Sequence, residues 1–408
     1  MTAALADPTI LSQLSSNTER VCVVSAGKAA WPMAAAADAA LGERVRALLV
    51  SGPRGSAHLS GAVEWIPAAH PLPDDASVRA GSRALAIARD AGAAGEPLLV
   101  LLSGGGSSML AAPPDGVPLR DKRAVIDTLM RRGANIRQLN CVRRHVSAIK
   151  GGRLAAAAGR SVTLAISDVH DPEDDPATIA SGPTIADRTT PADALAVLDD
   201  LQIVAPVSVT SHLKAARESG HSTPTLVAGA HHFRVVGHRR RAMQGAAGLA
   251  AQLGYRVHIE EAPSRGEARD AGRQFAERAL ACIVTGEPTC VIASGETTVR
   301  VVGGGRGGRN QEFALGAAPV LARHPGGLLA SAGTDGVDGP TDAAGGIVTT
   351  TTLTRAAAAG VDIARSLASN DAYDALARLG DLIITGPTGT NVGDVHLFLA
   401  AAEPERPI

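Results

Sequence analysis

The amino-acid sequence predicts an α/β protein with two domains. Short runs of valine, leucine and isoleucine alternate with alanine-rich stretches that favour helices. A length of 408 residues fits two or three domains and is enough to bury substantial cores. Glycine-rich, polar segments follow several of the expected strands, which is where ligands bind in open α/β sheets.

The first domain is expected at residues 1–220. Its strands are expected at 20–24, 46–51, 98–102 and 162–166, and its helices at 32–41, 76–91, 124–132 and 192–201. The run Leu98–Leu102 is wholly apolar, as expected of a strand that is covered on both faces. Asp74 or Asp75 is expected to cap the second of these helices. The alternation predicts a largely parallel, Rossmann-like sheet.

The second domain is expected at residues 221–408 and repeats the alternation. Its strands are expected at 224–228, 256–259, 289–293, 297–302, 328–332, 346–350 and 395–399, and its helices at 239–253 and 267–281. A tight Ser-Gly-Glu turn is expected to pair strand 289–293 with strand 297–302. His231-His232 is expected at a helix entry and not at a metal site.

Composition excludes several classes of protein. A net charge of −1 gives no reason to expect binding to nucleic acid or to a membrane surface. The N-terminus lacks the features of a signal peptide, and no apolar run approaches the roughly 20 residues that span a bilayer. The four cysteines form no CxxC pair, and we expect Cys22 and Cys282 to be buried, reduced thiols. These observations predict a cytoplasmic protein.

The most informative segment is Gly303–Gly308, which holds five glycines in six residues before a helix-like run. Glycine amides beside Arg306 and Arg309 would suit a phosphate or a carboxylate, whereas a flexible surface turn is the simpler alternative. The segment also fits a GxGxxG dinucleotide fingerprint. That fingerprint is weak here, because Arg300 interrupts the preceding strand and no acidic residue follows about 20 positions on.

Two further segments follow expected strands in the first domain. Ser103–Ser108 combines three glycines with three hydroxyl groups directly after the apolar strand, which predicts a phosphate-binding nest. Lys28 lies in Ser25-Ala-Gly-Lys and could meet a phosphate as a point charge, or be a surface lysine. The segment is not a Walker A motif, because Ala29 stands where that motif needs Ser or Thr.

Charged residues gather in three other segments. Arg143 and Lys150 would lie two turns apart on one helix face and could hold an acidic substrate, although a solvated basic helix is equally consistent. Asp168 follows an expected strand, where a carboxylate can bind Mg²⁺ through water or orient a hydroxyl. Residues 331–342 form a second acidic, glycine-rich loop that contains Thr334 and Asp335, and residues 385–391 form a hydroxyl-rich loop.

Taken in order, these motifs resemble those of the glycerate 2-kinase family, the MOFRL-type glycerate kinases, over nearly the whole chain. The stretches that carry the resemblance are 70–74 (His-Pro-Leu-Pro-Asp), 102–108, 140–154, 179–184 (Ile-Ala-Ser-Gly-Pro-Thr), 303–312, 333–341 and 385–391. The resemblance implies two α/β domains with the active site in the cleft between them. It also implies transfer of the ATP γ-phosphoryl group to the 2-hydroxyl of D-glycerate, with Mg²⁺.

The resemblance carries three catalytic roles onto this sequence, at Lys28, Asp168 and Arg309. The residue patterns add other candidates, each matched to a type of ligand. For nucleotide and phosphate they are Gly104, Gly105, Gly106, Ser107, Ser108, Gly303, Gly304, Gly305 and Asn310; for substrate Arg143, Lys150, Ser181, Thr334 and Asp335; and for metal Asp168 and Asp335.

Two segments depart from the family pattern. Members usually read Asp-Val-x-Gly-Asp-Asp where this chain has the longer 168–175, Asp-Val-His-Asp-Pro-Glu-Asp-Asp, without the glycine. The usual Asn-Val-Asn-Asp is Asn-Val-Gly-Asp at 391–394, which removes one polar side chain. Ligand contacts in both loops are therefore expected to differ from those of the family.

Two other functions compete with the kinase. Members of the family are often labelled hydroxypyruvate reductases, and an NAD(P)H-dependent reductase would need a dinucleotide site that only Gly303–Gly308 offers. A non-catalytic sensor of nucleotides or organic acids would not need Lys28, Asp168 and Arg309 together. For the kinase we expect small-molecule partners, ATP and D-glycerate, with neither nucleic acid nor membrane, and allow for a homodimer.

Overall fold

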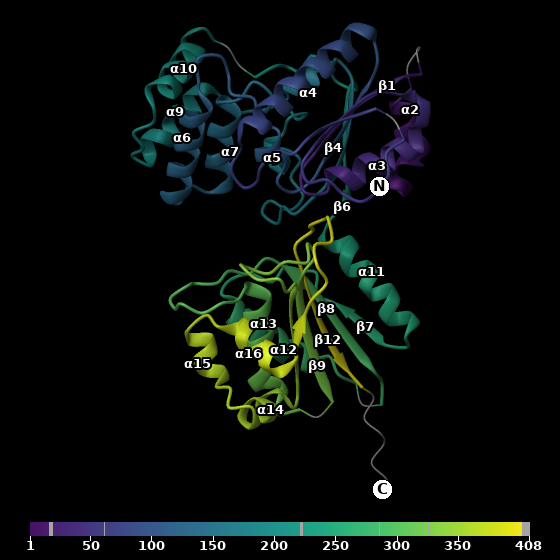
Figure 1. The fold of residues 1–408 in the computed structure, drawn as a ribbon, viewed down its shortest axis with the longest axis vertical. Coiled ribbons are helices and arrows are strands. Elements are labelled where there is room, and N and C mark those ends of the chain that lie inside the picture. The colour runs from purple at the N-terminus through teal and green to yellow at the C-terminus, as the bar shows by residue number, and fades with distance from the viewer. Residues whose placement is uncertain (16–18, 61, 221–222, 285, 325, 402–408) are drawn as a thin grey trace. The chain divides into compact units, whose positions relative to one another are not determined.

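The computed structural model describes residues 1–15, 19–60, 62–220, 223–284, 286–324 and 326–401 (Figure 1). The chain forms two compact units, Met1–Val236 and Gly237–Ile408. The boundary expected from the sequence adjoins residues 221–222, which lie outside the described residues. Within the described ranges, no helix has both the length and the apolar character needed to cross a membrane.

The first unit is built on a six-stranded sheet with the order β3-β2-β1-β4-β5-β6. Each neighbouring pair from β3 to β5 is parallel. The strands are β1 (Val21–Ala26), β2 (Val45–Ser51), β3 (Val63–Ile66), β4 (Leu98–Leu102), β5 (Ser161–Ile166) and β6 (His231–Gly237). The helices are α1 (Thr2–Leu5), α2 (Pro8–Gln13), α3 (Ala30–Leu41), α4 (Asp75–Ala94), α5 (Gly106–Met109), α6 (Leu119–Arg131), α7 (Ile136–His145), α8 (Arg153–Ala158), α9 (Pro191–Asp200) and α10 (Val207–Glu218), with 3-10 turns η1 (Gly42–Arg44) and η2 (Ile179–Ser181).

This sheet is covered on both faces, which explains its apolar strands. Alternate residues of β1 and β4 pack on α4 on one face and on α3 on the other. Both contacting helices are alanine-rich, so they lie close to the sheet. Asp74 caps α4 as expected, since its side chain accepts a hydrogen bond from the amide of Ser77 at 2.8 Å.

Four helices beside the sheet, α6, α7, α9 and α10, enclose a core of their own (Figure 1). The sequence analysis found parts of α6 and α9 but missed α7 and α10. Helix α7 ends at His145, so Arg143 and Lys150 do not share a helix face and that prediction was wrong. A turn carries Lys150 instead.

The second unit has a mixed six-stranded sheet with the order β11-β10-β9-β12-β8-β7. The pair β7·β8 is parallel and the other pairs are antiparallel. The strands are β7 (Arg256–Ile259), β8 (Thr289–Gly295), β9 (Gly327–Gly333), β10 (Gly345–Thr349), β11 (Leu382–Ile383) and β12 (Asp394–Ala400). The helices are α11 (Arg239–Gln252), α12 (Ala268–Ala281), α13 (Arg309–Leu321), α14 (Thr352–Ala358), α15 (Ile363–Ala368) and α16 (Ala372–Leu379).

Two strand predictions were wrong. Residues 224–228 have no regular structure, and the strand lies at β6, which contains His231 and His232. Residues 297–302 are not a strand but an extended segment with one isolated bridge, Glu267↔Thr298. The amides of Val302 and Gly303 donate to the side chain of Asn370 at 2.8 and 3.0 Å, so a side chain replaces the expected strand partner.

All four cysteines are free thiols. Cys22 is buried, as the sequence predicted. Cys282 is only half-buried, because it follows the last turn of α12, where its apolar neighbours Ile283 and Val284 are themselves partly exposed.

Helices α12 and α13 approach so closely that only glycine fits at their contact. A Cβ atom on Gly272 would lie 1.9 Å from the carbonyl oxygen of Phe313, and one on Gly316 would lie 2.2 Å from that of Arg269. Gly245 in α11 has no such neighbour within 4 Å. The two kinds of helical glycine therefore make a matched pair for a stability test.

We predict that Gly272→Ala destabilises the protein by about 1–3 kcal/mol, because the methyl group forces the two helices apart. Gly245→Ala should instead stabilise it by about 0.5–1 kcal/mol, since alanine favours an exposed helix interior. Urea unfolding, monitored by circular dichroism, measures both changes in stability. Equal shifts of the two midpoints would contradict the close packing of α12 on α13.

Candidate functional site

The first unit gathers its polar loops at one edge of the sheet. Lys28 follows β1, the Ser103–Ser108 segment follows β4, and Asp168 lies two residues after β5. Because these strands are parallel neighbours, their carboxyl ends meet at the same edge. The chain reverses its direction of winding between β1 and β4, which opens the crevice where open α/β sheets bind ligands.

Glycines bring these loops into contact. A Cβ atom on Gly104 would lie 2.2 Å from a carboxylate oxygen of Asp168, and one on Gly105 would lie 2.9 Å from the ring of His70. The amides of Gly104 and Gly105 have no acceptor among the described residues. The loop therefore offers two free amide donors, which a phosphate-binding nest requires, and packs closely against the Asp168 carboxylate.

A cavity of about 400 Å³ opens at this edge. Its wall combines the glycine loop, Asp168, basic side chains and an aliphatic patch. The lining includes Gly104, Gly105, Ser107, Ser108, Lys122, Arg123, Arg143, Lys150 and Asp168, and the aliphatic patch consists of Leu72, Ile126, Met130 and Ile136. Six of the sequence-predicted residues thus line one cavity with Asp168.

Three basic side chains that line this cavity, Lys122, Arg143 and Lys150, have no ion-pair partner within the described part of the chain. Burial and the charges of Arg143 and Arg153 lower the pKa of Lys122 to about 7. Burial also lowers the pKa of Arg143 to about 10. Among the described residues, neither Lys122, Arg143 nor Lys150 forms an ion pair with a carboxylate. Buried cations without a counterion favour an anionic ligand.

Lys150 holds the floor of the cavity together. Its ammonium group donates to the carbonyl and the hydroxyl of Ser107, at 2.9 and 3.1 Å, and to the carbonyl of Ala180 at 3.0 Å. Burial, followed by the charges of Lys122, Arg143 and Arg144, lowers its pKa well below the ordinary value. Lys150 therefore joins the β4 loop to the 3-10 turn η2.

Ser181 extends this network. The hydroxyls of Ser107 and Ser181 lie 2.9 Å apart, and Ser181 donates to the side-chain carbonyl of Asn140 at 2.9 Å. Ala180 and Ser181 both have positive φ angles, of 50° and 61°, which non-glycine residues rarely adopt. The surrounding contacts hold this strained turn in place. Ser181 is buried and contacts Ser107, and its predicted role in substrate binding stays a prediction.

Three residues near this cavity were missed by the sequence analysis: Lys122, His70 and Asn140. Burial and the charge of Lys28 lower the pKa of His70, while Asp168 opposes the shift. Lys122 lies in an amphipathic helix, where a lysine normally faces water. No local sequence pattern therefore predicts that it is buried. His70 lies within the 70–74 stretch that carried the family resemblance, and that stretch was the available clue.

In the second unit, Asp338 caps the helix that follows the glycine-rich segment. Its carboxylate accepts from the amides of Asn310 at 3.1 Å and Gln311 at 2.9 Å. A Cβ atom on Gly308 would lie within 2.5 Å of the same carboxylate. Burial raises the pKa of Asp338 to about 6, and the two amide bonds partly offset it. An internal carboxylate therefore occupies the helix N-terminus that the sequence offered to an external anion.

The glycine-rich segment itself packs against residues 369–371. The amide of Gly305 donates to the carbonyl of Ser369 at 3.0 Å, and that of Arg306 donates to Asp371 at 3.1 Å. A Cβ atom on Gly303 would lie 2.2 Å from the same carbonyl, whereas Gly304 faces open space. Close packing explains why glycine is needed at positions 303 and 305. Phosphate binding by this segment stays a prediction.

Arg309 forms a two-pronged ion pair with the buried Asp394, at 2.6 and 3.0 Å. Asn310 donates to the same carboxylate at 3.0 Å. Burial disfavours the charged form of Arg309, but its bonds to Asp394 and the nearby charge of Glu296 outweigh that effect and raise its pKa. Arg309 and Asn310 are thus fixed in the same network at the start of α13.

The predicted residues Thr334 and Asp335 lie in the loop after β9, which is tied to the hydroxyl-rich loop before β12. The Thr334 hydroxyl donates to the carbonyl of Gly393 at 2.6 Å, and the Thr388 hydroxyl donates to the carbonyl of Thr334 at 2.6 Å. The amide of Thr388 donates to the carbonyl of Asp335 at 3.1 Å. The structure therefore brings two of the predicted loops together in the second unit.

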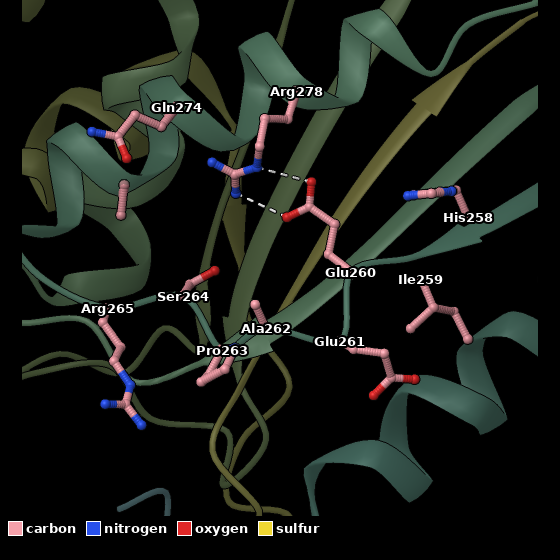
Figure 2. A pocket seen from close by; sticks show the side chains of 11 residues that line it. His258, Ile259, Glu260, Glu261, Ala262, Pro263, Ser264, Arg265, Gln274 and Arg278 are labelled. Carbon is pink, nitrogen blue, oxygen red and sulfur yellow. Dashed lines mark hydrogen bonds and ion pairs between the residues drawn. The ribbon is translucent and has the colours of Figure 1, made fainter.

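A separate cavity of about 680 Å³ lies at the end of β7 (Figure 2). Arg278 and Glu260, which both line it, form a two-pronged ion pair at 3.0 and 2.8 Å. None of the sequence-predicted site residues lines it. Because Arg278 and Glu260 already neutralise each other and no predicted site residue lines this cavity, it is a weaker candidate than the smaller one beside Asp168.

No group of three or more His, Cys, Asp or Glu side chains that could hold a metal ion occurs within the described ranges. Mg²⁺ rarely needs such a group, because it keeps several waters and binds one or two carboxylates together with substrate phosphates. Asp168, beside the free amides of the glycine loop, fits that type of site.

Comparison with known proteins gives a consistent result. Residues 2–214 match the family described as a domain of unknown function (DUF4147), and residues 289–394 match the MOFRL family. D-glycerate 2-kinase from Thermotoga maritima is 40% identical over 397 residues, covering 94% of this chain and 91% of that protein. A protein from Agrobacterium vitis, named for a proposed hydroxypyruvate reductase activity, is 41% identical over 389 residues, covering 93% and 87%.

The fold is also that of a solved relative. The crystal structure of glycerate kinase from Thermotoga maritima matches with a TM-score of 0.85 and 37% sequence identity. The match covers 98% of this chain and 95% of that one. The α/β architecture expected from the sequence is thereby confirmed.

We predict that sulfate binds the first unit's cavity with uptake of a proton. At pH 8 Lys122 is mostly neutral, and a bound anion raises its pKa, so up to about one proton is taken up and affinity falls as pH rises through 7. Calorimetry in two buffers of different ionisation enthalpy measures the uptake. Lys122→Met should reduce it, whereas Lys214→Met on the exposed face of α10 should not. Binding enthalpies that are equal in both buffers would contradict the prediction.

Proposed function

This chain belongs to the MOFRL-type glycerate kinase family, and we propose that it transfers the γ-phosphoryl group of ATP to the 2-hydroxyl of D-glycerate, giving 2-phosphoglycerate. The observation that carries the proposal is the first unit's cavity. There, basic side chains without an ion-pair partner among the described residues line the same cavity as the Asp168 carboxylate and a glycine loop with two free backbone amides. Phosphoryl transfer to a small hydroxy acid needs basic groups for the acid, a carboxylate for the hydroxyl and amide donors for the phosphate within one site.

The basic end of the cavity binds the acid. Arg143 makes no hydrogen bond or ion pair within the described residues, so its fork is available to a carboxylate. Lys122 lies in the same wall and adds charge. Lys150 acts mainly on Ser107 and Ala180, and so positions the loop that the substrate meets.

Asp168 lies where the acceptor hydroxyl must be held. Its carboxylate would orient the 2-hydroxyl and take its proton as the bond to phosphorus forms. The neighbouring amides of Gly104 and Gly105 would hold phosphate oxygens. Lys28, half-buried at the end of β1, would neutralise charge on the transferring group.

Mg²⁺ belongs to the proposal. We infer that Asp168 would hold it in the first unit and assign Asp335 as the candidate in the second. The ion would neutralise charge on the phosphate oxygens.

Arg309 is proposed to contact the nucleotide phosphates through the part of its guanidinium that Asp394 does not occupy. Asp394 is buried and depends on this arginine for its charge balance. Arg309→Ala would leave that charge unpaired and cost about 3–5 kcal/mol of stability. Loss of activity in this variant therefore needs a stability control before it is assigned to catalysis.

The reductase alternative has less physical support. A dinucleotide would place its pyrophosphate at the N-terminus of α13, where the Asp338 carboxylate already accepts the amides of Asn310 and Gln311. Like charges at that position repel. The cytoplasmic location and the homodimer stay predictions.

The proposed reaction can be assayed directly. Purified protein with ATP, Mg²⁺ and D-glycerate should form ADP, and enolase should convert the product to phosphoenolpyruvate without a mutase, because enolase accepts the 2-phosphate. The same preparation should not oxidise NADH with hydroxypyruvate. A product that needs the mutase would overturn the 2-hydroxyl assignment, and NADH oxidation without ADP formation would overturn the kinase.

Lys28→Ala and Asp168→Asn should each lower kcat/KM by a hundredfold to a thousandfold, about 3–4 kcal/mol of transition-state stabilisation. Lys214→Ala and Asp200→Asn change the same residue types on exposed helix surfaces and serve as matched controls. Circular dichroism establishes that each variant is folded. Retention of more than about a tenth of the activity, a loss below 1.4 kcal/mol, would remove that residue from the catalytic set.

A further inference from the structure

The two tryptophans of this chain meet in one pocket of the first unit. The sequence contains only Trp31 and Trp65, in a chain with 2% aromatic residues. Their ring centroids lie 6.2 Å apart with an edge-to-face angle of 88°. Together with residues 54–59 they line a pocket of about 680 Å³. So scarce a residue type, gathered at one cavity, indicates a ligand with a flat ring.

Arg54 completes the pocket. Its guanidinium lies 5.4 Å from the centroid of each indole ring. Among the described residues it forms no ion pair with a carboxylate. Trp65 is 37% exposed, so one indole remains open to a ligand while Trp31 is buried. An aromatic face beside an unneutralised guanidinium suits an aromatic base that carries phosphates.

The pocket is held in shape before any ligand arrives. The indole N–H of Trp31 donates to the carbonyl of Ala57 at 2.7 Å, and that of Trp65 donates to the carbonyl of Gly52 at 3.0 Å. The amide and the hydroxyl of Ser60 both donate to the buried Asp38, at 2.6 and 2.7 Å. Little conformational entropy is then lost when a ring stacks there.

The pocket also lies next to the proposed phosphate site. Trp65 is in β3, Arg54 follows β2 and Lys28 follows β1, and these strands are neighbours in the sheet. Adjacent strands are about 4.8 Å apart. The amide of Gly27 donates to the carbonyl of Ser51 at 3.1 Å, which joins the two loops. The pocket and Lys28 therefore lie at the carboxyl ends of neighbouring strands.

Neither of the other cavities described above offers the same chemistry. The cavity beside Asp168 has an aliphatic patch and a basic wall, which suit the acid, and the cavity at the end of β7 has its charges paired. We propose that the pocket of Trp31, Arg54 and Trp65 binds the purine base of the nucleotide co-substrate, with its phosphates directed toward Lys28 and Gly104. This inference rests on the proposed kinase activity and assigns the base a site within it.

Intrinsic fluorescence tests the proposal, because both tryptophans are in the pocket. ADP should quench the emission of the unmodified protein. Inorganic tripolyphosphate and D-glycerate, which lack a base, should not. ADP that binds by calorimetry without changing the emission would overturn the proposal, as would equal quenching by tripolyphosphate.

Steady-state kinetics provides the second measurement. Trp65→Leu and Arg54→Ala should each raise the KM for ATP roughly fivefold to a hundredfold, the range expected for loss of one stacking partner, and leave the KM for D-glycerate unchanged. Trp65→Phe should keep most of the affinity, and Arg89→Ala on the exposed face of α4 is the control for charge.

The outcomes separate this inference from the kinase proposal. If the unmodified protein forms no ADP from D-glycerate and ATP, the kinase proposal fails. If it does form ADP but the folded variants keep the KM for ATP, or raise only that for D-glycerate, the base does not bind among the tryptophans and this inference alone is overturned.

Discussion

The first unit's site depends on a buried ammonium group with no counterion. Lys150 is 2% exposed, and its three hydrogen bonds all go to neutral oxygens. Burying a charge without a paired charge is costly, so the surrounding structure must supply these acceptors in fixed positions. Those acceptors are Ser107, in the β4 loop, and Ala180, in the strained turn η2. The same lack of counterions makes the cavity attractive to an anion.

The two glycine-rich segments have similar composition and different physical roles. In the segment after β4, Gly104 and Gly105 bring free amides beside Asp168 and His70, which leaves donors for a ligand. In the segment before α13, Gly303 and Gly305 pack on the backbone of residues 369–371, and Asp338 occupies the helix N-terminus. A glycine-rich composition predicts that another group contacts the backbone closely. It does not predict whether that group belongs to a ligand or to the protein itself.

In the second unit, Arg309 balances the charge of a buried carboxylate, and this structural role complicates the assignment of a catalytic role to it. Arg309, Asn310 and Asp394 form one buried network, in which the arginine neutralises a carboxylate that has no access to water. A role in structure and a role in binding are therefore combined in Arg309.

The sequence by itself determined the α/β class, most of the strands, a minority of the helices, and the loops that carry Lys28, Asp168 and the Ser103–Ser108 nest. These follow from local patterns: apolar runs, alanine-rich stretches, and glycine at strand ends. Tertiary structure decided which charges are buried and which amides are free. Lys122 in an amphipathic helix, and Asp338 at the start of α13, gain their roles from residues far away in the chain. The strand expected at 297–302 failed for the same reason, because the partner of its amides is the side chain of Asn370, and no local pattern encodes that contact.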